Sequence, residues 1–185
     1  MDPSPGLTLA TLFADFGMIL FALILVLLNG FFVAAEFAMV KLRSTRVEAI
    51  AEQHGWRGQI LRTVHSQLDA YLSACQLGIT LASLGLGWVG EPAFAHILEP
   101  LLDAVGVQSA EVIKGVSFFA AFFVISYLHI VVGELAPKSW AIRKPELLSL
   151  WTAVPLYLFY WAMYPAIYLL NASANAILRI AGQGE

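Results

Sequence analysis

The sequence has 185 residues, of which 59% are hydrophobic and only 12% are charged, and its mean hydropathy is +0.77. Soluble domains carry about 25% charged residues, so this composition excludes an ordinary soluble protein and indicates a membrane protein. The net charge of −3, without an extended basic patch, argues against a nucleic-acid partner. The single cysteine, Cys75, excludes a disulfide framework and a CxxC metal site, and we expect it to be a buried packing residue.

The first strongly apolar segment, residues 16–41, predicts a transmembrane helix. Its first twenty positions carry no charge and would form a helix about 30 Å long, enough to cross the hydrocarbon core. No basic leader or cleavage site accompanies it, so we do not expect a cleaved signal peptide. The polar residues 45–67 that follow are interrupted at Gly55, which predicts two short amphipathic helices at the membrane surface.

Two further spans are expected at 70–90 and 113–134. The span at 70–90 is rich in Ser, Ala and Gly, which lets neighbouring helices approach closely. Between the two spans lies the acidic, proline-containing stretch 92–103, which predicts a short surface or re-entrant helix.

The last apolar stretch, 147–180, is divided by Pro155 and Pro165. A kinked fourth span and a pair of interfacial half-helices both fit this pattern. Aromatic residues are typical of the membrane interface, and their concentration before Pro165 favours the second alternative.

The distribution of basic residues predicts the orientation. Lysine and arginine follow the first and third spans, whereas the loop after the second span is acidic. By the positive-inside rule the N-terminus lies outside and the C-terminus in the cytoplasm. We therefore expect one domain, residues 1–185, that is all-α and multi-pass in the inner or plasma membrane, with three transmembrane helices and short juxtamembrane helices.

Polar groups of all three spans are predicted to meet at one depth. Glu36 lies five residues from the cytoplasmic end of the first span and Glu134 four from that of the third, so both are roughly 6–8 Å inside the membrane. The second span runs the other way and brings Ser73 and Gln76 to the same level. Carboxylate, hydroxyl and amide oxygens suit a hard cation such as Mg²⁺, and a helix interrupted between Gly133 and Pro137 would add free carbonyls.

Structural explanations for the same residues remain open. Glu36 could pair with Lys41 or Arg43 and Glu134 with Lys138, while Ser73, Gln76 and Thr80 could serve as interhelical hydrogen-bonding groups. Asn29 fits a packing role and a role behind the ligands equally well, and His129 is read as a satisfied core histidine. No HExxH, GxSxG or phosphate-loop motif is present, so we do not expect an enzyme.

Three segments together, NGFFVAAEFAMVKLR, LDAYLSACQLGITLASLGLGWVGEPAF and HIVVGELAPKSWAIRKPE, resemble the transmembrane domain of the CorC / cyclin M (CNNM) magnesium transporters, once described as hemolysin-C-like. The resemblance covers roughly residues 15–180. It implies a homodimer within membrane lipid that exports Mg²⁺, often discussed as coupled to Na⁺. In the family ATP binds only to cytosolic CBS domains, and we expect this chain to end before them.

Carried over by position, the resemblance implies a metal site formed by all three spans. The implied ligating positions are Ala34, Ala35 and Glu36, then Cys75 and Gln76, then Gly133 and Glu134. Many relatives have serines and asparagines where this chain has alanines and Cys75-Gln76, so the first span would offer main-chain carbonyls and Gln76 or Ser73 would replace asparagine. Positions that would support the site or its pathway are Asn29, Cys75, Thr80, Pro137 and Lys138.

Two functions therefore compete. In the first, a dimeric Mg²⁺ transporter works by alternating access, with Glu134 as its main acidic ligand and the backbone from Gly133 to Pro137 as its moving part. In the second, the membrane domain does not transport and instead senses Mg²⁺ or regulates a partner. The two intramembrane glutamates favour the first.

Overall fold

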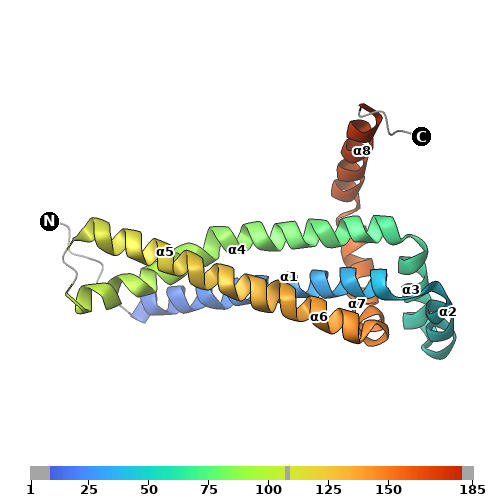
Figure 1. Cartoon of the computed structure of the whole chain (residues 1–185), viewed down its shortest axis with the longest axis horizontal. Helices are drawn as coiled ribbons and strands as arrows, with labels where there is room; N and C mark the ends of the chain where they lie inside the picture. Colours follow the sequence, from blue (N-terminus) through green and yellow to red (C-terminus); the bar gives the residue numbers. More distant parts are fainter. Residues whose placement is uncertain (1–8, 107–108, 181–185) are drawn as a thin grey trace.

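The structure, a computed structural model, describes residues 9–106 and 109–180, and this part of the chain is almost entirely helical and contains no strand. Three long helical rods run side by side along the molecule (Figure 1): α1 (Leu9–Lys41), α4 (Leu68–Ala104), and α5 (Ala110–Leu128), η1 (His129–Leu135) and α6 (Ala136–Arg143) in succession. Each is long and apolar enough to cross a membrane. The predicted all-α membrane fold with three spanning helices is confirmed.

Two short helices, α2 (Ser44–Gln53) and α3 (Gly55–Ser66), lie together at one end of the bundle (Figure 1). Gly55 joins them with φ +53°, a left-handed conformation that glycine adopts without strain. Each helix buries one narrow apolar face, including Val47 on α2 and Leu61 on α3. They are the two amphipathic helices that the polar segment predicts.

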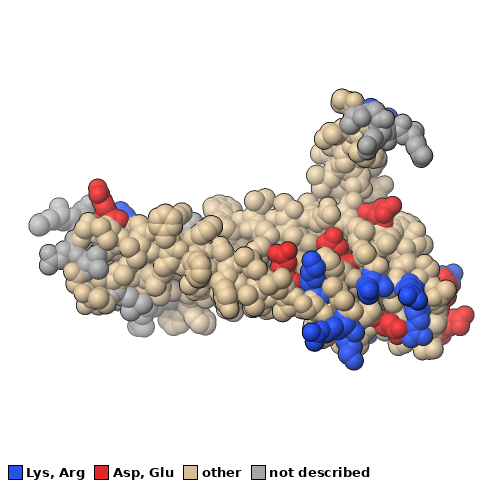
Figure 2. Space-filling model, viewed as in Figure 1, with Lys and Arg blue, Asp and Glu red and all other residues tan. Residues whose placement is uncertain are grey.

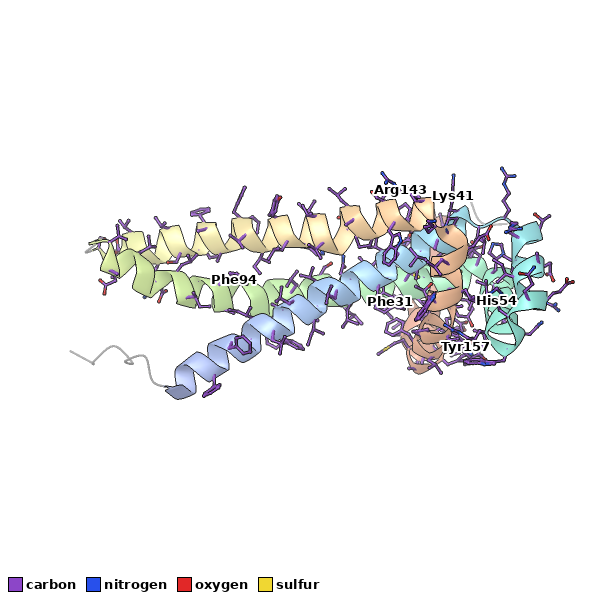
Figure 3. The ribbon with its side chains drawn as sticks, turned by 90° about the horizontal axis from the view of Figure 1, so that it is seen from below. Phe31, Lys41, His54, Phe94, Arg143 and Tyr157 are labelled. Carbon is purple, nitrogen blue, oxygen red and sulfur yellow. The ribbon has the colours of Figure 1, made fainter. Side chains whose placement is uncertain are left out.

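The stretch 92–103 is not a separate surface helix, because α4 continues through it to Ala104. Ala93 is buried, and Phe94 packs against the apolar cluster of Ala22 from α1, Leu86 from α4 and Ile125 from α5 (Figure 3). Contact with both neighbouring rods explains why the helix extends beyond the 21 uncharged residues from which the span was predicted.

The C-terminal apolar stretch forms two helices, α7 (Pro145–Ala162) and α8 (Tyr164–Ile180), which meet at a bend of 80°. Pro165 falls in the first turn of α8, where its missing N–H costs no helical hydrogen bond. α7 packs on the bundle, whereas α8 projects away from it (Figure 1). The described chain has three spanning helices, or four if this bent pair crosses as one broken span.

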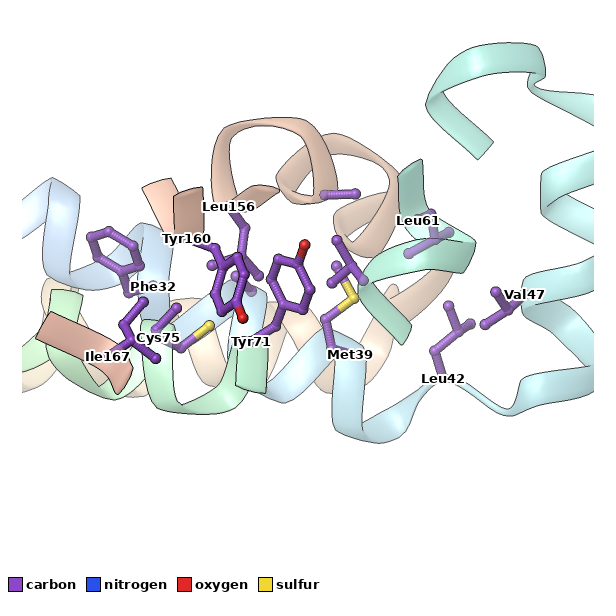
Figure 4. Packing of buried hydrophobic residues seen from close by; sticks show 14 of the residues in the cluster. Phe32, Met39, Leu42, Val47, Leu61, Tyr71, Cys75, Leu156, Tyr160 and Ile167 are labelled. Carbon is purple, nitrogen blue, oxygen red and sulfur yellow. The ribbon is translucent and has the colours of Figure 1, made fainter. Parts of the chain in front are cut away.

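The main apolar core lies at the α2–α3 end and ties α1, α4 and α7 together (Figure 4). Met39, Tyr71 and Leu156 are fully buried there, and the rings of Tyr71 and Tyr160 lie 4.5 Å apart. Cys75 is buried in the same cluster. This packing fixes the halves of α1 and α4 that carry Glu36 and Gln76.

Candidate intramembrane polar site

The third rod does not break between Gly133 and Pro137, as the sequence suggested, but widens into the π-helix η1. In an α-helix the ring of Pro137 would clash with the carbonyl four residues earlier, which is that of Gly133. The N–H of Ala136 instead reaches back five residues to the carbonyl of Val131, which is the π-helical pattern. The backbone stays helical, and the Gly133 carbonyl is freed from its α-helical role.

The side chain of Asn29 hydrogen-bonds the carbonyl of Gly133. Its side-chain amide Nδ2 donates to Gly133 O at 2.9 Å, and its Oδ1 accepts from Ser83 Oγ at 3.1 Å. Ser83 Oγ also lies 3.2 Å from Nε2 of His129. Asn29, which is only 1% exposed, thus joins α1 to α4 and to η1. These hydrogen bonds fit both predicted roles of Asn29, since it packs between the rods and also holds the carbonyl of Gly133, a predicted ligand position. His129 is satisfied by Ser83.

Sequence reasoning missed Ser83. It stands seven residues after Gln76 and three after Thr80, so the three fall on one helical face. That polar stripe was the signal that could have identified it.

A close contact between α1 and α6 lies beside this network. A Cβ added at Gly30 would meet Cγ of Pro137 at 2.9 Å and the carbonyl oxygen of Val132 at 3.2 Å. Only glycine allows the first rod to approach the proline this closely. Gly30 and Pro137 therefore position η1 against α1.

Glu36 lies half-buried on α1 with partners from two other helices. The side-chain amide of Gln76 on α4 and the ammonium of Lys138 on α6 both act on its carboxylate, and the thiol of Cys75 is near enough to sense its charge. Lys138 also places Nζ 4.5 Å from the ring centre of Phe37. One carboxylate, one amide and one ammonium from three rods therefore lie near one another, with Glu36 and Lys138 half-buried and Gln76 exposed on this single chain.

The simple ion-pair explanations for the two glutamates do not hold in the described part of the chain. Its ion pairs within 4.0 Å are Arg46–Glu146 and Arg62–Glu48, so neither Glu36 nor Glu134 forms one. Glu134 lies within η1 and is exposed on this single chain.

The other predicted site residues divide between the site and its surroundings. Ser73 Oγ lies 2.9 Å from Asn171 Oδ1 and 3.0 Å from the Asp69 carbonyl, so it joins α4 to α8. Thr80 Oγ1 donates to the carbonyl of Gln76 at 2.8 Å. Ala34 and Ala35 are buried on α1 just before Glu36.

The chemistry of this arrangement is that of oxygen donors. Among the described residues no three His, Cys, Asp or Glu side chains converge as a metal cluster. A cation at this level would have to combine carboxylates with amide and main-chain oxygens, a set typical of hard cations rather than of zinc.

Comparison of the sequence with known proteins assigns the chain to a family. Residues 20–185 match the family model described as the cyclin M transmembrane N-terminal domain. The chain belongs to the cyclin M family. It is similar to the UPF0053 proteins YhdT and YugS of Bacillus subtilis (strain 168), with 47% and 45% identity over 159 residues, 86% of this chain. It is also 38% identical to the uncharacterized protein Rv1841c of Mycobacterium tuberculosis over 89% of its length.

This cyclin M domain spans only part of such relatives. The matched region is 34% of the length of YhdT, 37% of YugS and 46% of Rv1841c. The resemblance seen in the three sequence segments is thus confirmed at the level of the family and of this membrane domain.

Proposed function

We propose that this domain carries Mg²⁺ across the membrane by alternating access, with the ion as its cargo. The supporting observation is the half-buried carboxylate of Glu36 on α1, with Gln76 of α4 and Lys138 of α6 close to it. A carboxylate at membrane depth is costly to maintain and usually marks an ion pathway. Glu134 adds a second carboxylate on η1, and π-helical turns are frequent at functional sites.

Four further features of the proposed transport rest on the family resemblance. They are Mg²⁺ export, coupling to Na⁺, a homodimer, and a cytoplasmic position for the end that carries α2 and α3. Glu134, Gln76 and Thr80 are exposed on a single chain, so the second copy or lipid would cover them. α5 likewise exposes large aromatics, among them Phe119 and Phe123, each 71% exposed.

The test is Mg²⁺ flux in liposomes that contain the purified domain, measured with a Na⁺ gradient in each direction. Glu134→Ala and Glu36→Gln are compared with wild type and with Glu111→Gln, which removes an exposed carboxylate from the first turn of α5. We expect flux to be lost in the first two variants and kept in the third. A dependence on the gradient would identify Na⁺ as the coupling ion.

Two outcomes would contradict the proposal. Flux retained in Glu134→Ala would remove that residue from the ion path. Absence of flux from the wild type, with Mg²⁺ still bound in calorimetry, would favour the alternative of a Mg²⁺-sensing or regulatory membrane module.

A further inference from the structure

A basic cavity opens at the α2–α3 end of the bundle. It has a volume of about 450 Å³ and lies between α2 and the junction of α6 with α7, where Arg46, Arg143 and Lys144 line it. Its carboxylate, Glu146, is held by Arg46 through two hydrogen bonds of 2.7 Å. Arg143 and Lys144 therefore leave the cavity with an excess of positive charge. Lysine and arginine gather at this end of the molecule (Figure 2).

A long apolar groove lies next to it, between α1, the η1–α6 segment and α7. Its volume is about 1000 Å³, and Leu27, Pro137 and Trp151 are among its lining residues. Leu27 stands fourteen residues before Lys41, so the groove extends to a depth of about 21 Å from that end of α1. This exceeds the thickness of one leaflet, which is about 15 Å of hydrocarbon.

The cavity and the groove meet at Leu147, which lines both. Leu147 lies in the first turn of α7 and is 47% exposed, so it marks the boundary between a charged and an apolar environment. Trp140 and Trp151 also line the groove and are more than half exposed, as is typical of aromatic residues at the membrane interface.

We propose that this continuous surface binds an anionic phospholipid. Its phosphate headgroup lies in the cavity with Arg143 and Lys144, and an acyl chain follows the groove along α1 and α7. Guanidinium and ammonium groups are strong partners for phosphate, and basic pockets beside transmembrane helices on the cytoplasmic side are typical sites for anionic headgroups. A second protein copy would satisfy the apolar groove but would leave the excess charge beside it unexplained.

The test uses quenching of tryptophan fluorescence by brominated lipids, because two tryptophans line the groove. In a background of Trp56→Phe, Trp88→Phe and Trp161→Phe, the remaining reporters are Trp140 and Trp151. The protein is placed in vesicles that contain either dibrominated phosphatidylglycerol or dibrominated phosphatidylcholine. We expect half-maximal quenching at a mole fraction about five-fold lower for phosphatidylglycerol.

A matched pair of double variants separates the cavity from general surface charge. Arg143→Gln with Lys144→Gln removes two charges from the cavity, and Arg62→Gln with Arg179→Gln removes two exposed charges elsewhere. We expect the first pair to abolish the preference for phosphatidylglycerol and the second to preserve it.

Three results would overturn the proposal. Equal quenching by both lipids in the protein that keeps Arg143 and Lys144 would show that the site does not select the phosphatidylglycerol headgroup. An equal loss in both double variants would reduce the preference to overall charge. Quenching by neither lipid would show that the groove is closed to lipid, as when a second copy occupies it.

Discussion

The crossing of α1 and α4 depends on Gly78, and this dependence gives a quantitative prediction. A Cβ at Gly78 would lie 2.5 Å from three ring atoms of Phe32. That ring is buried, 5.1 Å from the ring of Phe31 and 4.7 Å from the ring of Phe159, so it has little room to move. We expect Gly78→Ala to cost about 1–3 kcal/mol through overpacking.

Gly87 in the same helix provides the control, because a Cβ there would meet nothing within 4 Å. Both substitutions gain about 0.8–1 kcal/mol in helix propensity, and this gain cancels when the two variants are compared. For a chain of this size each kcal/mol corresponds to about 2–4 °C in Tm. Gly78→Ala should therefore melt about 2–12 °C below Gly87→Ala.

The assay is thermal unfolding in detergent at a fixed scan rate, with both variants measured side by side. Phe32→Leu added to Gly78→Ala removes the ring that causes the clash, so the double variant should be less destabilised than the sum of the single ones. If Gly78→Ala melts at or above Gly87→Ala, the close crossing of α1 and α4 is wrong.

Two further pairs of residues give predictions that the same melting assay can check. Ser83→Ala removes the hydroxyl that donates to Asn29 and should cost about 0.6–1.7 kcal/mol, whereas Ser149→Ala should be close to neutral because its buried hydroxyl has no partner among the described residues. Arg46 lowers the pKa of Glu146 from its ordinary value of 4.5, so this pair stabilises the fold above that pH, and the contribution is lost as the pH falls through the lower folded-state pKa. Glu146→Gln should therefore show a smaller loss of Tm between about pH 6 and pH 3, and about 1 M salt should remove the difference from wild type.

The spans were predictable because membrane depth imposes long uncharged runs, and the runs at 16–35, 70–90 and 115–133 correspond to the three spanning helices, whereas the fourth, 147–178, forms the bent pair α7 and α8. The length of α4 was not, because helix continuation beyond residue 91 depends on the packing of Ala93 and Phe94 against helices distant in sequence. The bend between α7 and α8 was likewise undetermined, because Pro155 and Pro165 mark two possible interruptions. In the structure Pro155 lies inside α7, and the bend falls at Met163, two residues before Pro165.

The polar site was predictable in part for the same reason. Helical rise alone brings Glu36 and Gln76 to one depth, and the structure places them beside each other. Rise does not determine rotation about the helix axis, so Ser73 was assigned to this site although it lies against Asn171 of α8. Glu134 is exposed on one chain, so its surroundings depend on what covers that surface, which the sequence of one chain does not encode locally.

If the domain transports ions as proposed, the π-helix η1 (His129–Leu135) restricts the motion that could carry them. A broken helix could unwind locally, but η1 keeps its backbone bonded, with Ala136 N–H on Val131 O and Asn29 on Gly133 O. Pro137 disfavours a return to the α-helical pattern at Gly133, so we expect the widened turn to persist during any such motion. Alternating access would then move the α5–η1–α6 rod as a body against α1, sliding at the Gly30–Pro137 contact.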